Sequence, residues 1–306
     1  MNKYISICFA INNSYYEQTI KIIKSIITYT NSELIKVYVL FNDLDAENKI
    51  KILNLQNNNA RVNIKLIKIS NYIFDNIKIT IPHTSIETYF RLLIPTIFKD
   101  IEDKILYLDA DIVIRHNIDD LWETDIQNFC LAGVEDTFIK AINYKNNIGL
   151  LNDDIYVNAG VLLFNIKRIT QLFSGDEIIS AAEKIEKSKK INFQDQDIIN
   201  IIFKGQIKKI NKRFNLTMAE IRNSSIDIIE NAAIIHYTGS KKPWNVKNPD
   251  SIPYKYYFTE TNNINKLSSS LKKEDYNGYR HYSWFSIPLW KKRLKLASAP
   301  IKEQFS

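Results

Sequence analysis

The stretch KILYLDADIVIR, residues 104–115, places two carboxylates directly after a short apolar run. The run 105–108 predicts a buried strand, which Asp109 and Asp111 follow with one small residue between them. Residues two apart in an extended chain point to the same side, so we expect both carboxylates in one pocket beyond the carboxyl end of that strand. Two like charges there need compensation, and a hard divalent cation such as Mg²⁺ or Mn²⁺ suits carboxylate oxygens. A solvated Asp-x-Asp turn is the structural alternative.

The composition favours a globular protein of one large or two small domains. The chain has 306 residues, of which 45% are hydrophobic and only seven are glycine. We see no cleavable apolar leader after Met1 and no apolar run of the roughly 18–20 residues that span a bilayer. Cys8 and Cys130 lie in apolar sequence, which predicts buried thiols rather than a disulfide. We therefore expect a cytoplasmic protein.

Strands and helices alternate in the first third of the chain. The patterns predict strands at 4–11, 37–41 and 62–69 and helices at 15–29 and 45–56. This β-α-β-α-β order predicts a parallel sheet with helices on its faces. A loop at 71–82 and a helix at about 85–98 lead to the strand before Asp109.

The alternation loosens after Asp111. We expect a helical turn at 118–122, a strand at 131–134, an irregular polar segment at 136–154 and a buried strand at 156–165. Helices at 176–190 and 195–204 and a late strand at 232–237 follow. Asn158 and Gly160 lie at the mouth of the buried strand. No internal repeat is evident.

His236 closes the late strand, with Gly239 and Lys242 shortly after it. A glycine lets the backbone approach a ligand, and a lysine offers a point charge to a phosphate. An imidazole beside two carboxylates would complete a metal site of the Mn²⁺ type. A structural histidine at a strand end is the alternative.

A polar cluster, QDQD at residues 194–197, precedes an apolar run. It is either an acidic first turn of a helix, which the helix dipole favours, or a group that recognises sugar hydroxyls. Arg91, on a largely apolar helix, is either a snorkelling surface cation or a diphosphate contact.

Four motifs occur in a fixed order: LYLDAD at 106–111, NAGVLL at 158–163, QDQD at 194–197, and HYTGSKKPW at 236–244. Together they resemble the retaining glycosyltransferases of family 8, above all the bacterial α-galactosyl- and α-glucosyltransferases of lipooligosaccharide and lipopolysaccharide core synthesis. The likeness runs from about residue 4 to 245. It implies an α/β GT-A fold over residues 1–250, a Rossmann-like mixed sheet flanked by helices. It also implies a UDP-hexose donor, a Mn²⁺ ion with Mg²⁺ as an alternative, and a saccharide or glycolipid acceptor.

The resemblance also implies roles for individual residues. The metal ligands would be Asp109, Asp111 and His236. Donor contacts would come from the metal-binding carboxylates and from Ala10, Asn12, Tyr15, Arg91, Ala110, Asn158, Ala159, Asp195, Gly239 and Lys242. Asp195 and Gln196 would be catalytic, and His83 and Thr84 would lie on the acceptor side.

One departure concerns the base. The family usually reads Asp-Asp-Asn-Tyr after the first strand, whereas this chain reads Asn12-Asn13-Ser14-Tyr15. The Asn12 carbonyl can accept the uracil N3–H, but an amide can also donate, so cytidine is excluded less strictly than by an Asp. Tyr15 can still stack on the base.

The resemblance leaves the mechanism to be argued. Gln196 is an amide, a poor nucleophile without an activating base evident in the sequence, so we favour same-face attack over a covalent intermediate. A Mg²⁺-dependent phosphatase with an aspartyl nucleophile also fits Asp109 and Asp111, although such enzymes usually place that strand first in the domain. A non-catalytic nucleotide-sugar-binding module need not keep the metal ligands.

The net charge of +7 belongs to the C-terminal fifth. Residues 1–240 carry 28 basic and 29 acidic side chains, whereas residues 241–306 carry 13 and 5. Within the extension 251–306 we find the aromatic residues Tyr276, Tyr279, Tyr282, Trp284, Phe285 and Trp290, followed by Lys291, Lys292, Arg293 and Lys295. Aromatic and basic residues suit an anionic membrane surface, so we expect peripheral association with the inner face of the membrane and no nucleic acid binding. A terminal helix docked on the domain is the alternative.

Overall fold

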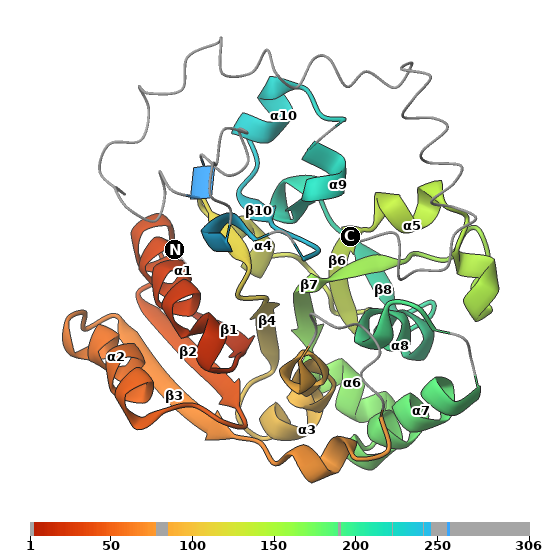
Figure 1. Cartoon of the computed structure of the whole chain (residues 1–306), viewed down its shortest axis with the longest axis horizontal. Helices are drawn as coiled ribbons and strands as arrows, with labels where there is room; N and C mark the ends of the chain where they lie inside the picture. The colour runs from red at the N-terminus through yellow and green to blue at the C-terminus, as the bar shows by residue number, and fades with distance from the viewer. Residues whose placement is uncertain are drawn as a thin grey trace.

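A mixed sheet carries the fold (Figure 1). The structure, a computed structural model, describes residues 3–77, 85–188, 191–221, 223–240, 242–245 and 256–257. Seven strands of this part form the sheet in the order β3-β2-β1-β4-β7-β6-β8. They are β1 (Tyr4–Ala10), β2 (Leu34–Phe41), β3 (Val62–Lys68), β4 (Lys104–Leu108), β6 (Leu131–Glu135), β7 (Val157–Asn165) and β8 (Ile207–Lys209). The first four are parallel, as predicted, whereas β7 runs antiparallel to both β4 and β6.

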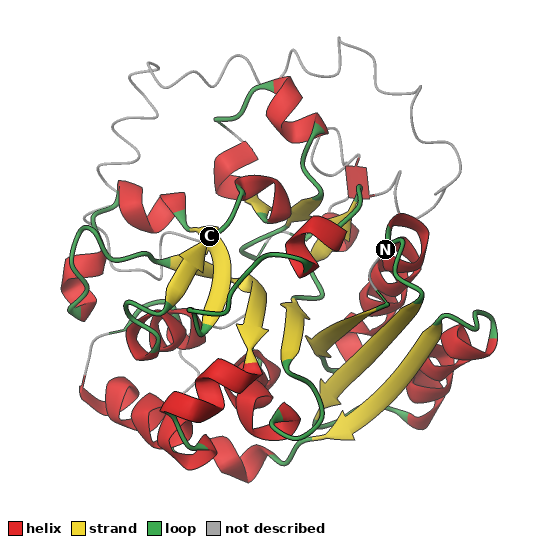
Figure 2. Ribbon diagram, turned by 180° about the vertical axis from the view of Figure 1, so that it is seen from behind, coloured by secondary structure: helices red, strands yellow, loops and turns green. Residues whose placement is uncertain are grey.

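Helices cover both faces of this sheet (Figures 1 and 2). Side chains alternate along β1, so that Ile7 and Phe9 join the core under α1 (Tyr16–Tyr29) and α2 (Ala46–Asn57), while Cys8 joins the opposite core. The opposite core lies under the 3₁₀ helix η3 (Ile86–Leu93), α3 (Ile94–Phe98), α6 (Ile166–Leu172), α7 (Gly175–Ser188) and α8 (Gln194–Ile202). The central strands β1, β4 and β7 are thereby buried on both faces, which explains their near-continuous apolar runs, whereas the edge strand β3 exposes Asn63 and Lys65.

A second, three-stranded sheet brings the end of the described chain back to the carboxylate stretch. It has the order β5-β10-β9, with β5 (Ile112–Ile114), β9 (Leu216–Thr217) and β10 (Ile234–His236). β10 is antiparallel to β5, and His236 pairs with Ile112. This register sets the imidazole beside Asp111.

Several predicted elements differ from the structure. The helix expected at 85–98 is mostly the 3₁₀ helix η3, because Pro95 in the first turn of α3 has no N–H to continue an α-helical ladder. The segment 136–154 is only partly irregular, since Asp136 caps α5 (Thr137–Ala141) by accepting from the N–H groups of Phe138 and Ile139. The elements not expected are β5, α6, β8, β9, η4 (Lys145–Ile148), η5 (Lys212–Phe214), α9 (Met218–Ile221) and α10 (Ile226–Glu230). The other short elements are η1 (Asn13–Tyr15), η2 (Asn71–Phe74), α4 (Asp119–Trp122) and η6 (Pro243–Asn245).

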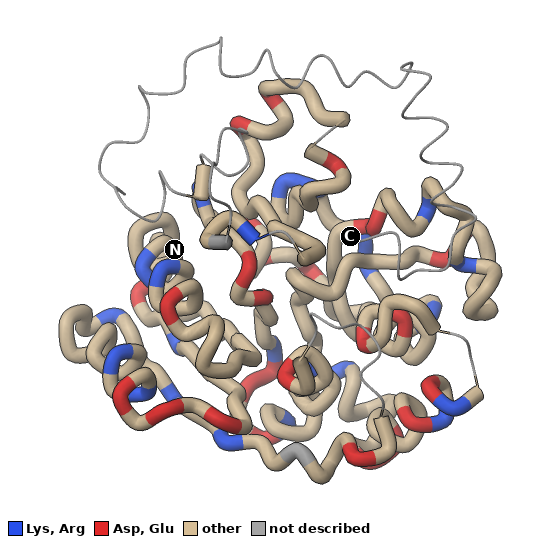
Figure 3. The backbone as a smooth tube through the Cα atoms, viewed as in Figure 1, with Lys and Arg blue, Asp and Glu red and all other residues tan. Residues whose placement is uncertain are grey.

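The C-terminal extension lies outside the described residues except for Tyr256 and Tyr257, which are buried. The Arg115 guanidinium lies 3.8 Å from the Tyr256 ring, and the rings of Tyr257 and Trp244 are 5.5 Å apart. Figure 3 shows both charge signs interspersed along the outer helices α1, α2 and α7. By the count of charged residues, the excess of positive charge lies in the last fifth of the sequence, and peripheral membrane binding stays a prediction.

Two further expectations can be checked in the described chain. Cys8 and Cys130 are free and buried, as predicted. None of the helices in the ranges that the structure covers is both long and apolar enough to cross a bilayer.

Candidate active site

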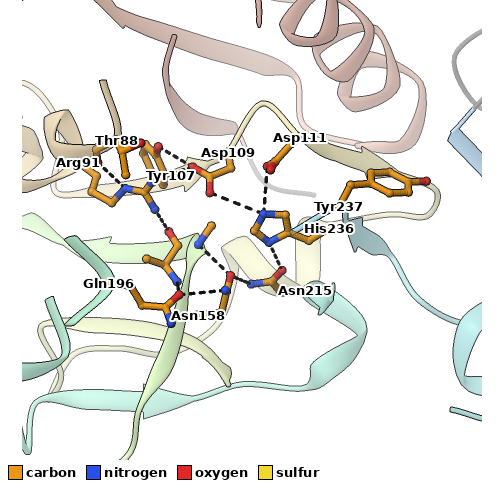
Figure 4. Close-up of polar contacts among 12 residues, drawn as sticks. Thr88, Arg91, Tyr107, Asp109, Asp111, Asn158, Gln196, Asn215, His236 and Tyr237 are labelled. Carbon is orange, nitrogen blue, oxygen red and sulfur yellow. Dashed lines mark hydrogen bonds and ion pairs between the residues drawn. The ribbon is translucent and has the colours of Figure 1, made fainter. Parts of the chain in front are cut away.

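Asp109, Asp111 and His236 converge where β4, β5 and β10 meet (Figure 4). Nε2 of His236 lies 3.0 Å from Asp111 Oδ1 and 3.7 Å from Asp109 Oδ2, and one donor atom from each residue lies within 4.8 Å of the others. The carboxylates thus point together as predicted, although residues 110–111 form a turn rather than an extended strand. The backbone of this turn is held by Asp109 N–H, which donates to the carbonyl of Gly160 at 2.8 Å, and by Tyr237 N–H, which donates to that of Asp111 at 2.9 Å.

A chain of amides fixes the orientation of the imidazole. Asn158 Oδ1 accepts from Gly160 N–H at 3.0 Å and from Asn215 Nδ2 at 2.9 Å. Asn215 therefore turns its oxygen to His236, where Nδ1 donates to it at 3.0 Å. Nε2 is left as the atom that faces the carboxylates, which is the arrangement of a metal-binding histidine oriented by an outer partner.

The residues present fit a divalent cation. Asp111 Oδ1 is buried and accepts no hydrogen bond, although it lies against Nε2. With Nδ1 carrying the ring proton, two electron pairs meet there, and a cation would satisfy both. Gly160 makes the room, because a Cβ on it would overlap Cε1 of His236 and lie 2.8 Å from Asp109 Oδ2.

Lys242 lies against one of these two carboxylates. Its Nζ is 2.5 Å from Asp111 Oδ2 and donates to the carbonyl of Tyr237 at 2.8 Å. Burial alone would raise the pKa of Asp111, but the positive charge of Lys242 holds it well below its usual range. Gly239 has φ +88°, and a side chain there would meet nothing within 4 Å, so its backbone is open to a ligand.

Arg91 is buried and bridges two carboxylates, so it is not a snorkelling surface residue. Nη2 lies 2.8 Å from Asp109 Oδ1, and Nε lies 3.1 Å from Asp195 Oδ2. Nη1 donates to the carbonyl of Ala159 at 2.5 Å, and the guanidinium stacks 4.5 Å from the Tyr107 ring. Arg91 thus ties Asp109 to α8 and β7.

The QDQD motif divides into two functions. Asp195, buried in the first turn of α8, faces Arg91, and burial raises its pKa to about 7 against the opposing effect of that cation. Asp197 instead accepts from the hydroxyls of Tyr144 and Tyr156 at 2.7 and 2.5 Å and from the N–H of Phe193 at 2.8 Å. It anchors the start of α8, so the helix-start interpretation is correct, and recognition of sugar hydroxyls stays a prediction.

Gln196 joins the amide chain at its other end. Its Oε1 accepts from Asn158 Nδ2 at 3.0 Å and from Ala159 N–H at 3.1 Å, while its Nε2 donates to Asp136 Oδ2 at 3.1 Å. Sequence reasoning missed both Asn215 and Asp136. Asn215 carries no local signal, but Asp136 directly follows β6, which runs in the same direction as β4, and could have been found by the same argument as Asp109.

The residues at the end of β1 lie beside the carboxylates. The parallel register of Cys8 with Tyr107 places Ala10 next to Asp109 two residues further on. Asn12 caps η1, and the Tyr15 ring packs edge-on against Trp244 at 5.8 Å. Burial, together with the charges of Asp111 and Asp109, raises the pKa of Tyr15, which therefore lies within their field. Ala110 is buried in the Asp-x-Asp turn, and the predicted acceptor residues His83 and Thr84 fall outside the described residues.

Comparison with known proteins agrees with this geometry. The sequence model of glycosyl transferase family 8 matches residues 6–248. A Haemophilus influenzae protein assigned to the glycosyltransferases is 34% identical over 249 residues, which cover 79% of this chain and 74% of that protein. A lipopolysaccharide 1,3-galactosyltransferase of Salmonella typhimurium is 30% identical over 164 residues, about half of each chain (51% and 49%). The crystal structure of the galactosyltransferase LgtC with donor and acceptor sugar analogs has a TM-score of 0.73 at 25% identity and covers 90% of this chain and 100% of that one.

The family match spans the main sheet, the small sheet and all the site residues described above. It confirms the GT-A fold, a mixed α/β sheet flanked by helices, and it implies a nucleotide-sugar donor, a saccharide acceptor and a divalent cation. The chain is a glycosyltransferase and belongs to glycosyl transferase family 8.

Proposed function

We propose that the protein transfers galactose or glucose from a UDP-sugar to a saccharide acceptor, with retention of configuration and with Mn²⁺ as its metal. The observation that carries this proposal is Arg91, which joins a metal-binding carboxylate to Asp195 and so links a diphosphate-binding end to a sugar-binding end of one site. The name of the Salmonella typhimurium relative supports a lipopolysaccharide or lipooligosaccharide core as the acceptor. Such an acceptor would place the enzyme in the cytoplasm, at the inner face of the membrane.

The proposed diphosphate end uses residues from β4 and from the loop after β10. Asp109, Asp111 and His236 would hold the cation, which when bound would neutralise charge on the departing UDP. Lys242, 2.5 Å from Asp111, is within reach of the same phosphates, and the open backbone at Gly239 lets them approach. The uridine would lie over Ala10, Asn12 and Tyr15.

The proposed sugar end is formed by β7 and α8. Asp195 and Asn158 would bind hydroxyls of the hexose, and Ala110 and Ala159 would line the donor site. Both ends of the Gln196 amide are already hydrogen-bonded, and an amide is a poor nucleophile, so a covalent intermediate on Gln196 is disfavoured. We favour same-face attack: the acceptor oxygen bonds to the anomeric carbon as the bond to UDP breaks, and the hydroxyl proton passes to the leaving phosphate oxygen.

A panel of UDP-sugars with Mn²⁺, read by UDP release, tests the proposal. UDP-galactose or UDP-glucose should be turned over, EDTA should stop the reaction, and Mn²⁺ should restore it. Asp111→Asn should lose metal and nucleotide binding together. Full activity in metal-free buffer would refute the metal assignment, and a β-linked product, read from the anomeric proton coupling, would refute retention. Phosphate release from a simple phosphomonoester, with no turnover of any UDP-sugar, would favour the phosphatase alternative.

A further inference from the structure

A buried carboxylate lies against the residue that departs from the family pattern. Asn12 Nδ2 donates to Glu87 Oε2 at 3.4 Å, across 75 residues of sequence. Glu87 is only 6% exposed and lies on η3, which packs against β1. Arg91 donates from Nε to the carbonyl of Thr88 in the same short helix at 2.8 Å. One 3₁₀ helix therefore holds both Glu87, beside Asn12, and Arg91, beside the carboxylates.

Two hydrogen bonds fix which end of the Asn12 amide points where. Its Oδ1 accepts from Ser14 N–H at 3.0 Å, and a backbone N–H can only donate. Its Nδ2 faces the Glu87 carboxylate, which in its ionised form can only accept. A flip of the amide would set donor against donor at Ser14 and acceptor against acceptor at Glu87. The carbonyl oxygen keeps a second lone pair for another donor.

The place of Asn12 makes it a candidate contact for the base. It follows β1 at the edge where Ala10 lies beside Asp109, and Tyr15 lies within the field of both metal-binding carboxylates. This step rests on the proposed function, which seats a uridine diphosphate at that edge. Uracil presents an N–H donor at N3, whereas cytosine presents a lone pair at N3.

We infer that Glu87 sets the base specificity of the donor site by accepting one N–H of Asn12 and so holding the amide with its carbonyl oxygen available to N3 of the base. Asn12 and Glu87 together then recognise the base as a single carboxylate would. The Asn12 oxygen accepts from the uracil N3–H and repels the N3 lone pair of cytosine. Without Glu87, only the Ser14 N–H would oppose rotation of the Asn12 amide, whose N–H groups could then reach the N3 lone pair of cytosine. Glu87 is thus a positioning residue, acting through Asn12.

Titration of the protein with UDP and with CDP, in saturating Mn²⁺, tests the inference by calorimetry. The wild type should prefer UDP by at least about tenfold, as expected for a site with a matched hydrogen-bonding group. Glu87→Gln should bring the two affinities to within about threefold of each other, because an amide at 87 can donate as well as accept and no longer opposes a flip of the Asn12 amide. Glu102→Gln is the matched control, since Glu102 is equally buried but pairs with Lys36 and Tyr38. It should leave the preference unchanged.

A pair of exchanges separates base recognition from a loss of folding. Asn12→Asp alone puts two carboxylates in contact and should weaken UDP binding. The double variant Asn12→Asp with Glu87→Gln restores one donor and one acceptor, and should recover the wild-type preference for UDP. A folded Glu87→Gln that keeps the full preference overturns the inference but leaves the proposed function intact. A wild type that binds neither nucleotide overturns both.

Discussion

The side-chain oxygen of Asn215 lies 3.0 Å from Nδ1 of His236, and the same amide donates to Asn158 at 2.9 Å. Because Asn158 in turn donates to Gln196, one chain of hydrogen bonds orients a proposed metal ligand and the proposed sugar end of the site together. A change at one end of this chain is expected to be felt at the other.

Asn215→Ala should weaken Mn²⁺ binding by roughly 10–100-fold, the usual effect of removing the partner that orients a metal-binding histidine. Without its acceptor, the ring can rotate or carry its proton on Nε2, the atom that faces the carboxylates. Calorimetric titration with Mn²⁺ measures the change. The control is Asn211→Ala, which removes an amide that only caps η5 through Arg213 N–H. Equal metal affinity in the two variants would show that Asn215 does not orient the ligand.

Gly160→Ala should fold but bind metal at least about tenfold more weakly, because the added methyl group would occupy the space of the imidazole and crowd Asp109. The matched control is Gly205→Ala, in the turn before β8. Gly205 has φ +73° with nothing within 4 Å of a Cβ, so alanine there costs only backbone strain, about 1 kcal/mol. Thermal unfolding and Mn²⁺ titration of both variants separate strain from crowding. Unchanged metal affinity in Gly160→Ala would contradict the geometry.

The stability of the protein should fall with rising pH through Asp195. Its pKa is raised by burial from an ordinary value of 3.8 to about 7, so the carboxyl group stabilises the fold when protonated and loses that contribution as pH rises through 7. Asn mimics the protonated acid, so the melting temperature of Asp195→Asn, minus that of the wild type, should grow between pH 4 and 7 and level off near 8. The shift of the Asp195 pKa corresponds to at most roughly 4 kcal/mol in the free energy of unfolding. Both proteins are measured in EDTA by thermal unfolding, and a flat difference would rule out a raised pKa.

Gln196→Ala should be slow but not inactive. The substitution removes a fixed amide beside Asn158 and Ala159 but deletes no covalent step in a same-face mechanism. A loss in kcat of about 10²–10³-fold is expected for one lost stabilising group. Single-turnover kinetics with the preferred UDP-sugar measure this loss in rate. The measured loss includes the effect of freeing the Asn158 side chain, which donates to Gln196 in the wild type. Trapping of a covalent glycosyl adduct on Gln196 would contradict the mechanism.

Residues 276–306 should bind anionic membranes. The full-length protein should sediment with anionic liposomes and be released by high salt, since each cation near such a surface contributes about 1 kcal/mol. Deletion of 276–306 should abolish sedimentation and spare UDP-sugar hydrolysis, because Tyr256 and Tyr257, which pack on the domain, are retained. Exchange of Lys291, Lys292, Arg293 and Lys295 for glutamate is the charge control. Unfolding of the truncated protein would make the extension structural.

The first half of the fold could be predicted because its signals are local. The apolar periods of 4–10, 16–29 and 34–41 each lie within one element, and parallel strands joined by helices have few arrangements. The two carboxylates after β4 could be placed at the sheet edge for the same reason. The small sheet could not be predicted, because β5 has three residues and its partner β10 comes from far along the chain. The role of Asn215 depends on that pairing, because the pairing places His236, whose Nδ1 donates to Asn215.

The pairing of β10 with β5 also has a consequence for folding during synthesis on the ribosome. Asp109 and Asp111 emerge early in synthesis, but the imidazole that completes their set arrives only with the last strand of the small sheet. A nascent chain that ends before His236 carries two close carboxylates without their nitrogen partner and lacks one ligand of the proposed cation site. Because the partners are distant in sequence, this closure is expected to be a late step of folding. Tight metal uptake would then mark the moment at which β10 docks.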